Sequence, residues 1–391
     1  MKAVTCTEGR LELADVPDPE PEEGHVLLDV VRTGICGSDL HARHHAGELA
    51  EACSLVGYDG IMRPHESVIM GHEFSGTVAA YGPGTRRRVP TGRPVVAMPM
   101  LRRAGQGHLT GLSAHAPGGY AERVLVQESL MFPVPGSLDP KLAALTEPMA
   151  VALHAVRRGQ VAKRRVAVVI GCGPVGLAVI GMLKATGVRT VIASDLSTGR
   201  RTLATDMGAD HVVDPAQESP FATATEHGHL TQASQMLDLG LDAMAKLTRL
   251  PHWWHAYRLA ERAGRTSPRS PVVFECVGIP GMIDRVMAET PIGSRVVVVG
   301  VCMSTDHVRP VLGINKELDL RFVFGYTPLD FRDALNLLAG GTVPAARLVT
   351  GEVGLPGVAA AFDALAHPGT HAKILVDPRS DTTRPQELQP S

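Results

Sequence analysis

The sequence has few of the features that mark secreted, membrane-bound or nucleic-acid-binding proteins. Its 391 residues include only six cysteines, with no C-x-x-C pair among them. Scattered cysteines in a chain of this size favour a reducing compartment over a disulfide framework. The first residues, MKAVTCTEGRLELADV, lack the apolar core of a secretory signal. We therefore expect a cytoplasmic protein.

An excess of charge of one sign is also lacking. The formal net charge is −2, and no basic stripe or arm is present. Nucleic acid and anionic membranes are therefore not expected as partners. One charge-free run, VAVVIGCGPVGLAVIGML at 166–183, has the length of a membrane span. Because it contains four glycines and a proline, a buried strand that leads into a buried helix explains it better.

The chain is too long for one ordinary hydrophobic core, so we expect two domains. Residues 1–150 contain short β-rich segments broken by turns, such as HVLLDVVRTG and FSGTVAAYGPGT. Between residues 151 and 304, apolar strands such as RVAVVIG alternate with helical segments, which is typical of a doubly wound parallel sheet. Residues 305–377 become β-like again. Residues 378–391 are polar and are predicted to be disordered.

The alternation of strands and helices lapses at about residues 216–268. Apolar residues at helical spacing predict an inserted segment of about two helices there. Both tryptophans of the chain, Trp253 and Trp254, lie in this insertion beside His252 and His255. We interpret them as a hydrophobic anchor that docks the insertion, with a ligand contact as the alternative.

A glycine-rich loop, GCGPVG, lies between a predicted strand and a predicted helix. Gly171, Gly173 and Gly176 have the G-x-G-x-x-G spacing that permits a tight turn and a close approach of the backbone to a pyrophosphate. The pyrophosphate would lie at the helix N-terminus, beside Pro174 and Val175. The context of the motif therefore predicts a dinucleotide site.

An acidic residue is expected about twenty positions beyond such a loop, where it would hold ribose hydroxyls. Asp195 stands 19 residues after Gly176. Its carboxylate would repel a 2′-phosphate, so NAD is favoured over NADP. Arg200 and Arg201 lie close by, and NADP stays open as the alternative.

Two stretches near the N-terminus and one near residue 150 carry candidate metal ligands. Cys36 lies in TGICGSDLH, and His72 and Glu73 lie in GHE. Glu147 lies among apolar residues in ALTEPMAVAL, where an unpaired carboxylate would be costly and a cation would suit it. A catalytic zinc takes three such protein ligands and keeps one position open. Taken singly, each residue could instead be structural, since cysteine is often a small buried hydrophobic residue.

Five motifs in this order resemble the zinc-dependent medium-chain alcohol dehydrogenase family: TGICGSDLH, GHEFSGTV, GGYAE, LTEPMAVALHA and VIGCGPVGLAV. The resemblance is to the sorbitol and threonine dehydrogenase-like branch, and it covers nearly the whole chain apart from the insertion and the tail. It implies an α/β protein with a β-rich, GroES-like (chaperonin-like) catalytic domain formed by residues 1–150 and 305–377. A Rossmann domain, residues 151–304, would be inserted between these parts, with the active site in the cleft between the domains.

The resemblance also implies a reaction, which is the reversible NAD-linked oxidation of a secondary alcohol or polyol with one catalytic zinc per chain. Zinc would lower the pKa of the substrate hydroxyl, so that the alkoxide forms near neutral pH and a hydride passes to nicotinamide. A homodimer or homotetramer is implied as well. The RVVVVG strand is a candidate edge for pairing the sheets of two subunits.

By motif position, the family's metal ligands correspond to Cys36, His72 and Glu147. Glu73 would be a nearby carboxylate that can exchange onto the metal. Asp39 resembles the residue that orients the ligating histidine.

The family's proton path corresponds to Ser38 and His41. Ser38 would accept the proton of the substrate, and His41 would pass it to solvent, a task that suits a pKa near neutrality. His41 could instead be a plain surface residue.

The sequence departs from the family pattern in three places. The region 100–120, where many members hold a second, structural zinc with four cysteines, has no cysteine. His108 and His115 alone do not make a closed site, so we expect one zinc. The second departure is a long loop predicted at 42–65, which could line the substrate cleft. Its possible substrate contacts are His44, His45 and Cys53. The third departure is the helical insertion.

Two rival functions stay open at this point. A zinc-free, NADPH-dependent enone or quinone reductase would share the fold, but the Cys36, His72 and Glu147 set and Asp195 disfavour it. A non-catalytic NAD-binding protein could use the insertion as a partner surface, but it leaves Ser38 and His41 without a role.

Overall fold

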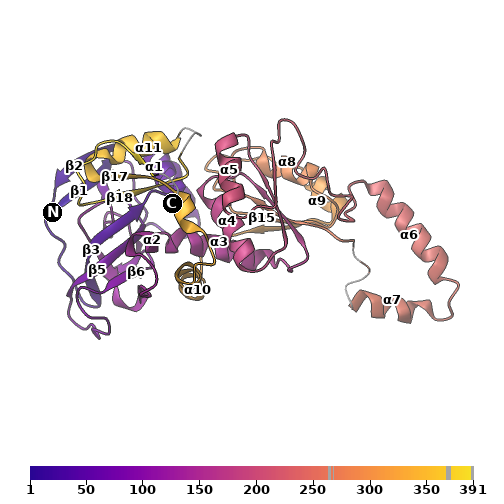
Figure 1. Ribbon diagram of the computed structural model, residues 1–391, viewed down its shortest axis with the longest axis horizontal. Helices are drawn as coiled ribbons and strands as arrows, with labels where there is room; N and C mark the ends of the chain where they lie inside the picture. The colour runs from indigo at the N-terminus through magenta and orange to yellow at the C-terminus, as the bar shows by residue number, and fades with distance from the viewer. Residues whose placement is uncertain (263–265, 267, 367–370, 389–391) are drawn as a thin grey trace. The chain divides into compact units, whose positions relative to one another are not determined.

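The computed structural model describes residues 1–262, 266, 268–366 and 371–388, and the chain divides into two compact units (Figure 1). The first unit contains Met1–His154, Gly173–Ala185 and Gly325–Ser391. The second contains Ala155–Cys172 and Thr186–Phe324. The first unit therefore takes both ends of the chain. None of the described helices is long and apolar enough to cross a membrane.

Two main sheets form the first unit. The larger has eight strands in the order β10-β6-β5-β3-β18-β17-β19, with β9 also paired to β3, and the smaller has the order β2-β1-β4. A hairpin, β7-β8, occupies the cysteine-free region. The bounds are β1 (Lys2–Thr7), β2 (Arg10–Asp15), β3 (His25–Gly34), β4 (Val68–Ile69), β5 (Glu73–Tyr81), β6 (Pro94–Ala97), β7 (Met100–Arg103), β8 (Gln106–Leu109), β9 (Arg123–Gln127), β10 (Met131–Pro133), β17 (Val349–Gly354), β18 (Lys373–Asp377) and β19 (Gln386–Glu387).

Strand β3 joins parts of the first unit that are far apart in the sequence. Its last residue, Gly34, lies opposite Glu73 at the start of β5. The same residue lies opposite Leu375 of β18 on the other side. Because helix α1 (Gly37–Leu55) begins three residues after Gly34, the end of β3 brings together the start of α1, the start of β5 and the middle of β18.

Helix α1 packs with α11 (Val358–Ala366) on the first unit (Figure 1). Ala42, Ala46 and Ala50 recur every four residues and are all buried. The first two belong to one apolar core with Phe362 of α11. Residues 42–55 are therefore helical, and the loop predicted for them is wrong. The unit's other helices are α2 (Pro140–Ala143), the N-terminal part of α3 (Thr146–Gly159), α4 (Pro174–Ala185) and α10 (Pro328–Ala339).

The second unit contains a six-stranded sheet in the order β13-β12-β11-β14-β15-β16, in which all neighbouring strands are parallel. Strand β15, which carries RVVVV, lies between β14 and β16. The prediction that it forms an edge is wrong, and β16 takes that place. The bounds are β11 (Val166–Ile170), β12 (Thr190–Ser194), β13 (His211–Val213), β14 (Val272–Glu275), β15 (Arg295–Val298), β16 (Asp319–Phe322) and α5 (Thr198–Asp206).

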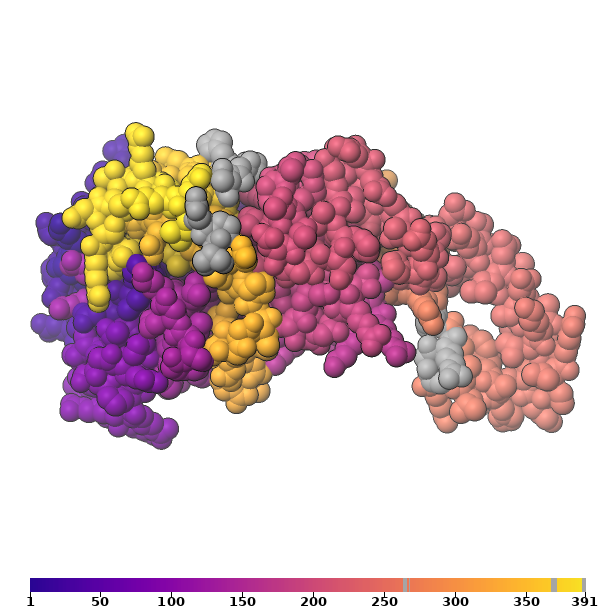
Figure 2. Space-filling model, viewed as in Figure 1, coloured from indigo at the N-terminus to yellow at the C-terminus, as the bar shows by residue number. Residues whose placement is uncertain are grey.

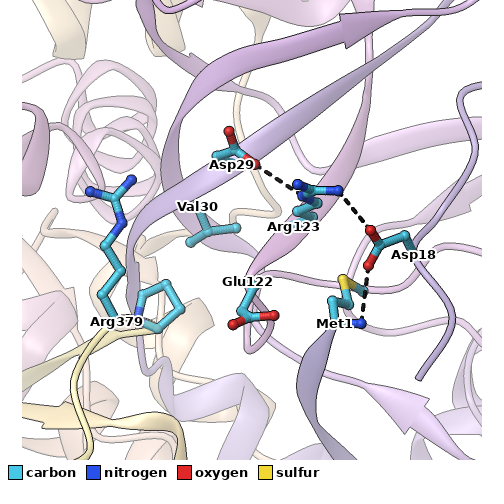
Figure 3. A pocket seen from close by; sticks show the side chains of 8 residues that line it. Met1, Asp18, Asp29, Val30, Glu122, Arg123 and Arg379 are labelled. Carbon is cyan, nitrogen blue, oxygen red and sulfur yellow. Dashed lines mark hydrogen bonds and ion pairs between the residues drawn. The ribbon is translucent and has the colours of Figure 1, made fainter. Parts of the chain in front are cut away.

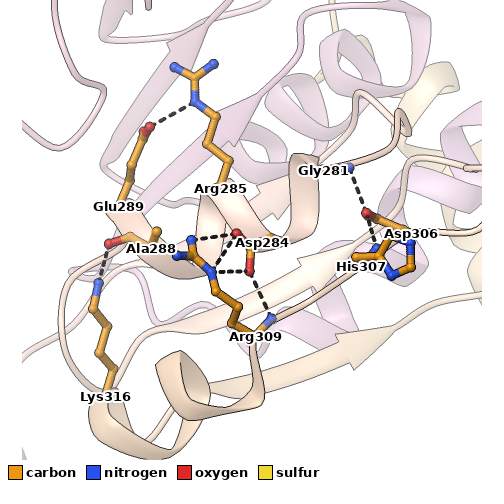
Figure 4. A network of polar contacts seen from close by, with 9 residues as sticks. All are labelled: Gly281, Asp284, Arg285, Ala288, Glu289, Asp306, His307, Arg309 and Lys316. Atoms are coloured by element: carbon orange, nitrogen blue, oxygen red, sulfur yellow. Dashed lines mark hydrogen bonds and ion pairs between the residues drawn. The ribbon is translucent and has the colours of Figure 1, made fainter.

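Figure 4 shows the polar network that holds α8 (Met282–Glu289) and α9 (Pro310–Lys316) beside this sheet. Arg309 donates to both carboxylate oxygens of Asp284, at 3.1 and 2.7 Å. Asp306 accepts from the backbone N–H of Gly281 at 2.7 Å. These contacts fix the chain that follows β15, at the carboxyl edge of the sheet.

The insertion lies between β13 and β14 and contains α6 (Ala233–Leu247) and α7 (Trp253–Arg262). The carbonyl of Leu230 accepts from the N–H of Ile292 as the chain enters, and His229 pairs with Arg269 as it leaves. No residue of either helix is buried. Trp254 is 45% exposed, so the predicted anchor is not seated in a core. Positions 263–265 and 267 of the insertion lie outside the described residues.

The tail is paired over most of its length. Strand β19 pairs antiparallel with β17, and the N–H of Gly354 donates to the carbonyl and hydroxyl oxygens of Thr382, at 3.1 and 2.8 Å. The prediction of disorder is therefore wrong for 378–388, because backbone hydrogen bonds replace the apolar burial that this polar segment lacks. Residues 389–391 of the predicted tail lie outside the described part of the chain.

Candidate active site

Cys36, His72 and Glu73 come together in the first unit. One side-chain ligand atom from each lies within 4.8 Å of the other two. The strand register explains the meeting, since Gly34 lies opposite Glu73 and Cys36 immediately precedes α1. Over the ranges that the structure describes, this is the one group of three or more His, Cys, Asp or Glu residues with such spacing.

A buried carboxylate orients His72. Asp39 is fully buried, and its Oδ1 lies 3.2 Å from Nδ1 of His72. Its Oδ2 accepts from the Tyr120 hydroxyl at 2.6 Å and from the N–H of Cys36 at 3.0 Å. Burial alone would lower the pKa of His72, but the Asp39 carboxylate raises it well above the ordinary value. Nδ1 thus faces the Asp39 carboxylate, and Nε2 faces the Ser38 hydroxyl at 3.2 Å.

Glu73 is held by a buried lysine that sequence analysis did not identify. Lys373 is 2% exposed. Its Nζ donates to both carboxylate oxygens of Glu73 at 2.8 Å and to the carbonyl of Ile35 at 3.0 Å. Burial lowers the pKa of Lys373, but the Glu73 carboxylate more than offsets this and raises it. The signal in the sequence was a lysine at the start of a strand whose next three residues are apolar, KILVD.

Glu147 is close to these residues but does not belong to the group of three. It is 9% exposed and shares a side-chain hydrogen bond with Tyr326. Burial raises the pKa of Glu147 to about 7, while the nearby His72 opposes the rise and Glu73 adds to it. Glu73 therefore lies inside the group of three, and Glu147 lies beside it. Tyr326 was not identified from sequence, because nothing in FGYT marks its partner.

The other histidines near the motif lie along α1. Burial, together with the charge of His45, lowers the pKa of the half-buried His41. His44 and His45 are exposed, and Nδ1 of His45 lies 3.5 Å from Glu48. Cys53 is half-buried near the helix end. Of these residues, the described geometry places none in the ligand group.

His108 and His115 lie close to each other, with ring centroids 5.0 Å apart. Nδ1 of His108 lies 3.2 Å from the hydroxyl of Ser113. In the described residues, no third ligand accompanies the two rings.

The glycine loop follows β11, and two of its glycines have different surroundings. Gly171 has a φ of +90°, and a Cβ there would lie 2.7 Å from the side chain of Val277, so a larger residue would not fit. A Cβ at Gly173 would meet nothing within 4 Å, which leaves space open above the loop. Pro174 begins α4, and Gly176 is buried within that helix.

Asp195 is tied to the same loop. Its Oδ2 accepts from the N–H of Cys172 and its Oδ1 from the N–H of Ser197, both at 2.8 Å. A guanidinium nitrogen of Arg200 lies 4.0 Å from the carboxylate. The Nε of Arg200 is buried without a hydrogen-bond partner. The Arg200 Nε has no partner among the described residues and lies on a side chain close to the Asp195 carboxylate, and the loop has open space at Gly173. These features fit the adenosine ribose of a dinucleotide.

A cavity of about 440 Å³ in the first unit has no link to this chemistry (Figure 3). Arg123 lies between Asp18 and Asp29, at 2.7 and 3.1 Å, and the amino group of Met1 pairs with Asp18 at 3.0 Å. These charges neutralise one another. The lining residues are Met1, Asp18, Asp29, Val30, Glu122, Arg123, Pro378 and Arg379.

Comparisons with known proteins agree with the fold and identify the family. A family model for zinc-binding dehydrogenases matches residues 174–340, and one for the alcohol dehydrogenase GroES-like domain matches residues 22–136. (R,R)-Butanediol dehydrogenase of Bacillus subtilis is 30% identical over 383 residues, which cover 94% of this chain and 96% of the relative. The chain belongs to the zinc-dependent medium-chain alcohol dehydrogenase family.

Other relatives of this alcohol dehydrogenase support the assignment. Sorbitol dehydrogenase of Bos taurus is 26% identical over 379 residues, which cover 94% of this chain and 93% of the relative. The crystal structure of 2R,3R-butanediol dehydrogenase from Bacillus subtilis has a TM-score of 0.73 at 30% identity, covering 97% of this chain and 99% of the other. A dehydrogenase of Sinorhizobium meliloti 1021, solved with NADP, has a TM-score of 0.72 at 25% identity, covering 96% and 99%.

These findings confirm the predicted family, the GroES-like and Rossmann fold, and the class of enzyme. The protein is an alcohol oxidoreductase that uses zinc and a nicotinamide cofactor, and its substrate is a small alcohol. The zinc-free reductase and the non-catalytic binding protein are not favoured.

Proposed function

We propose that this enzyme oxidises a secondary alcohol or polyol reversibly, with NAD as the hydride acceptor. The observation that carries the proposal is the convergence of a thiol, an imidazole and a carboxylate within 4.8 Å, beside the hydroxyl of Ser38. The names of two relatives, a butanediol and a sorbitol dehydrogenase, support a substrate with neighbouring hydroxyl groups.

The donor set suits zinc, which accepts sulfur, nitrogen and carboxylate oxygen in one site. We assign Cys36, Nε2 of His72 and Glu73 as the residues that would hold it, with Glu147 as the carboxylate that can exchange. This differs from the sequence prediction, which gave Glu147 the third place. When bound, zinc lowers the pKa of the substrate hydroxyl.

Residues at the start of α1 would carry the proton away. The hydroxyl of Ser38 lies at the donor set, 3.2 Å from Nε2 of His72, where it can accept the proton of the substrate. His41 follows three residues later on the same helical face. Because burial lowers the pKa of His41, its ring is neutral near pH 7 and can accept a proton in turn.

The cofactor would bind on the glycine loop, with its pyrophosphate at the N-terminus of α4, near Gly173, Pro174 and Val175. Asp195 would accept from the ribose hydroxyls, since each carboxylate oxygen keeps a second lone pair. Arg200 would use its unpartnered Nε on the adenosine half. The carboxylate favours NAD over NADP.

The Asp195→Ala substitution tests the cofactor preference. We expect the ratio of kcat/KM with NAD to kcat/KM with NADP to fall by about tenfold or more, which corresponds to the loss of one or two hydrogen bonds and a charge repulsion. An unchanged ratio would remove Asp195 from this role. The Asp210→Ala variant, which changes an acidic residue outside the loop, serves as the control.

We also propose that the enzyme forms a homodimer or homotetramer in the cytoplasm. Strand β16 is an edge of the six-stranded sheet among the described strands. Phe322 at its end is 65% exposed, and Ile314 of the preceding helix α9 is 74% exposed. Such an edge can pair with a second copy. All six cysteines are free, as a reducing compartment requires.

Zinc analysis combined with a substrate panel tests the proposal as a whole. We expect about one zinc per chain and reduction of NAD with butanediol or sorbitol that stops after chelation. A zinc-loaded protein that reduces NAD with a primary alcohol but with no diol or polyol would refute the substrate class. A protein that binds no zinc when it is resupplied would refute the ligand assignment.

A further inference from the structure

The helices of the insertion expose large apolar side chains at helical spacing. On α6, Leu237 and Leu241 are 69% and 70% exposed, and on α7, Leu259 is 70% exposed. Trp254, next to the start of α7, is 45% exposed. These residues lie in the salmon segment of Figure 2. A polar-rimmed group of exposed apolar residues typically marks a surface that contacts another protein.

Charges of opposite sign accompany the apolar residues on the two helices. Asp238 and Asp242 lie four residues apart on α6, and Arg258 and Arg262 lie four residues apart on α7. All four side chains are exposed. Within the described residues, none of them takes part in an ion pair. Each pair spans one helical turn, so the two carboxylates match the two guanidiniums in spacing as well as in sign.

The same register matches the apolar residues. If α6 lies antiparallel to α7 with Asp238 opposite Arg262, then Asp242 lies opposite Arg258. Leu241 and Leu259 then also face each other. Within one chain these faces do not meet, because the leucines and the charged groups are exposed on both helices. In a two-fold dimer each helix would meet its complement on the other copy, and the contact would form twice.

We infer that a second copy of this chain docks on the insertion, with α6 of each copy packed antiparallel against α7 of the other. The insertion leaves the six-stranded sheet at Leu230, whose carbonyl accepts from the N–H of Ile292 shortly before β15. It returns at Arg269, which pairs with His229 shortly before β14. It therefore leaves the sheet near the amino ends of its strands. The glycine loop follows the carboxyl end of β11, so this association leaves the loop free.

Charge reversal tests the inference in the full-length, zinc-loaded enzyme. The acidic face is reversed with Asp238→Lys/Asp242→Lys, the basic face with Arg258→Glu/Arg262→Glu, and a third protein combines all four changes. The mass in solution is measured by sedimentation velocity. We expect each reversed variant to have half the mass of the parent protein, and the combined variant to regain the parent mass.

Three controls make the result specific. The Asp206→Lys/Glu226→Lys variant carries the same change in charge outside both helices and should keep the parent mass. Turnover should be unchanged in every variant, which shows that the fold is intact. The Phe322→Asp substitution changes the proposed contact at β16 and leaves the insertion unchanged. It therefore tests the β16 contact separately from the contact between α6 and α7.

Several outcomes would overturn the inference. A monomeric parent protein, or reversed variants that keep the parent mass, would show that the insertion does not associate with itself. Loss of mass in both reversed variants without recovery in the combined one would refute the pairing of α6 with α7. If a different protein, and not a second copy of this chain, binds the insertion, the combined variant will not regain the parent mass.

Discussion

Gly34 shows how one residue sets the geometry of the active site. It lies opposite Glu73 in the pairing of β3 with β5, and a Cβ at this position would collide with the Glu73 carboxylate. A side chain here would push that carboxylate away from Lys373. The absence of a side chain in TGIC therefore matters as much as the cysteine that follows it.

The thiol of Cys36 can be tested directly. The Cys36→Ser substitution replaces a soft sulfur ligand with a hydroxyl, which zinc binds poorly. We expect turnover to fall by at least about a thousandfold and NAD binding to persist. Turnover followed by NADH absorbance and binding followed by calorimetry would check this. Cys53→Ser is the control, and a Cys36→Ser enzyme with most of its activity would show that the ligand is wrongly assigned.

The buried pair of Lys373 and Glu73 makes a prediction about stability. In the Lys373→Met variant, the Glu73 carboxylate would stay buried without its cation, at a cost of about 3–5 kcal/mol in the free energy of unfolding. Urea unfolding of the chelated protein would measure it. The double variant Lys373→Met/Glu73→Gln has no buried charge at this pair and should recover most of the loss. A single variant as stable as the parent protein would contradict the role of the pair.

The short motifs TGICGSDLH and GHE, through their resemblance to the family, pointed to Cys36, Asp39 and His72 in the sequence. They could not locate the partners of Glu73 and Glu147. Lys373 lies 300 positions from Glu73, and only the register of β18 against β3 brings them together. No local pattern carries that information.

Predictions of single helices and strands failed where the local sequence does not determine the position of the segment in the fold. The segment after His41 has alanines four residues apart, a helical spacing, yet its position between two ligands suggested a loop. RVVVVG was predicted as an edge, whereas strand order, which depends on the crossovers, places it inside the sheet. Element type follows from local pattern more closely than element position does.

The segment that leads into the insertion should respond to pH. Burial, with the charges of His227 and two arginines, lowers the pKa of His229 to about 4, below the unfolded value of about 6.5. The folded protein then binds fewer protons than the unfolded chain between these values, so stability falls as the pH drops through this window.

The matching experiment is urea unfolding at pH 7 and pH 5. Because one pKa unit is worth about 1.4 kcal/mol, His229 should cost the parent protein roughly 2 kcal/mol between these two conditions. The His229→Gln variant should be spared that loss, and His211→Gln, at an exposed position, should not be. Equal losses in all three proteins would mean that His229 titrates normally.

At the scale of the whole molecule, the proposed metal ligands and the residues that would hold the adenosine half of the cofactor belong to different parts of the chain. Cys36, His72 and Glu73 all lie in the first unit, whereas Asp195 and Arg200 lie in the second. We expect chelation to abolish turnover and to change the affinity for NADH by less than about threefold. Both are measured on one sample, by activity and by NADH fluorescence. A parallel loss of NADH binding would contradict this separation.

The insertion also has a practical meaning for protein engineering. Its two ends are adjacent, because His229 pairs with Arg269, and no residue of its helices is buried. A chain that leaves and returns at neighbouring points can be cut there and joined to another domain with little disturbance to the parent fold. The segment between Leu230 and Arg269 is therefore a natural place to graft a reporter or a binding module onto this dehydrogenase while its catalytic residues stay in place.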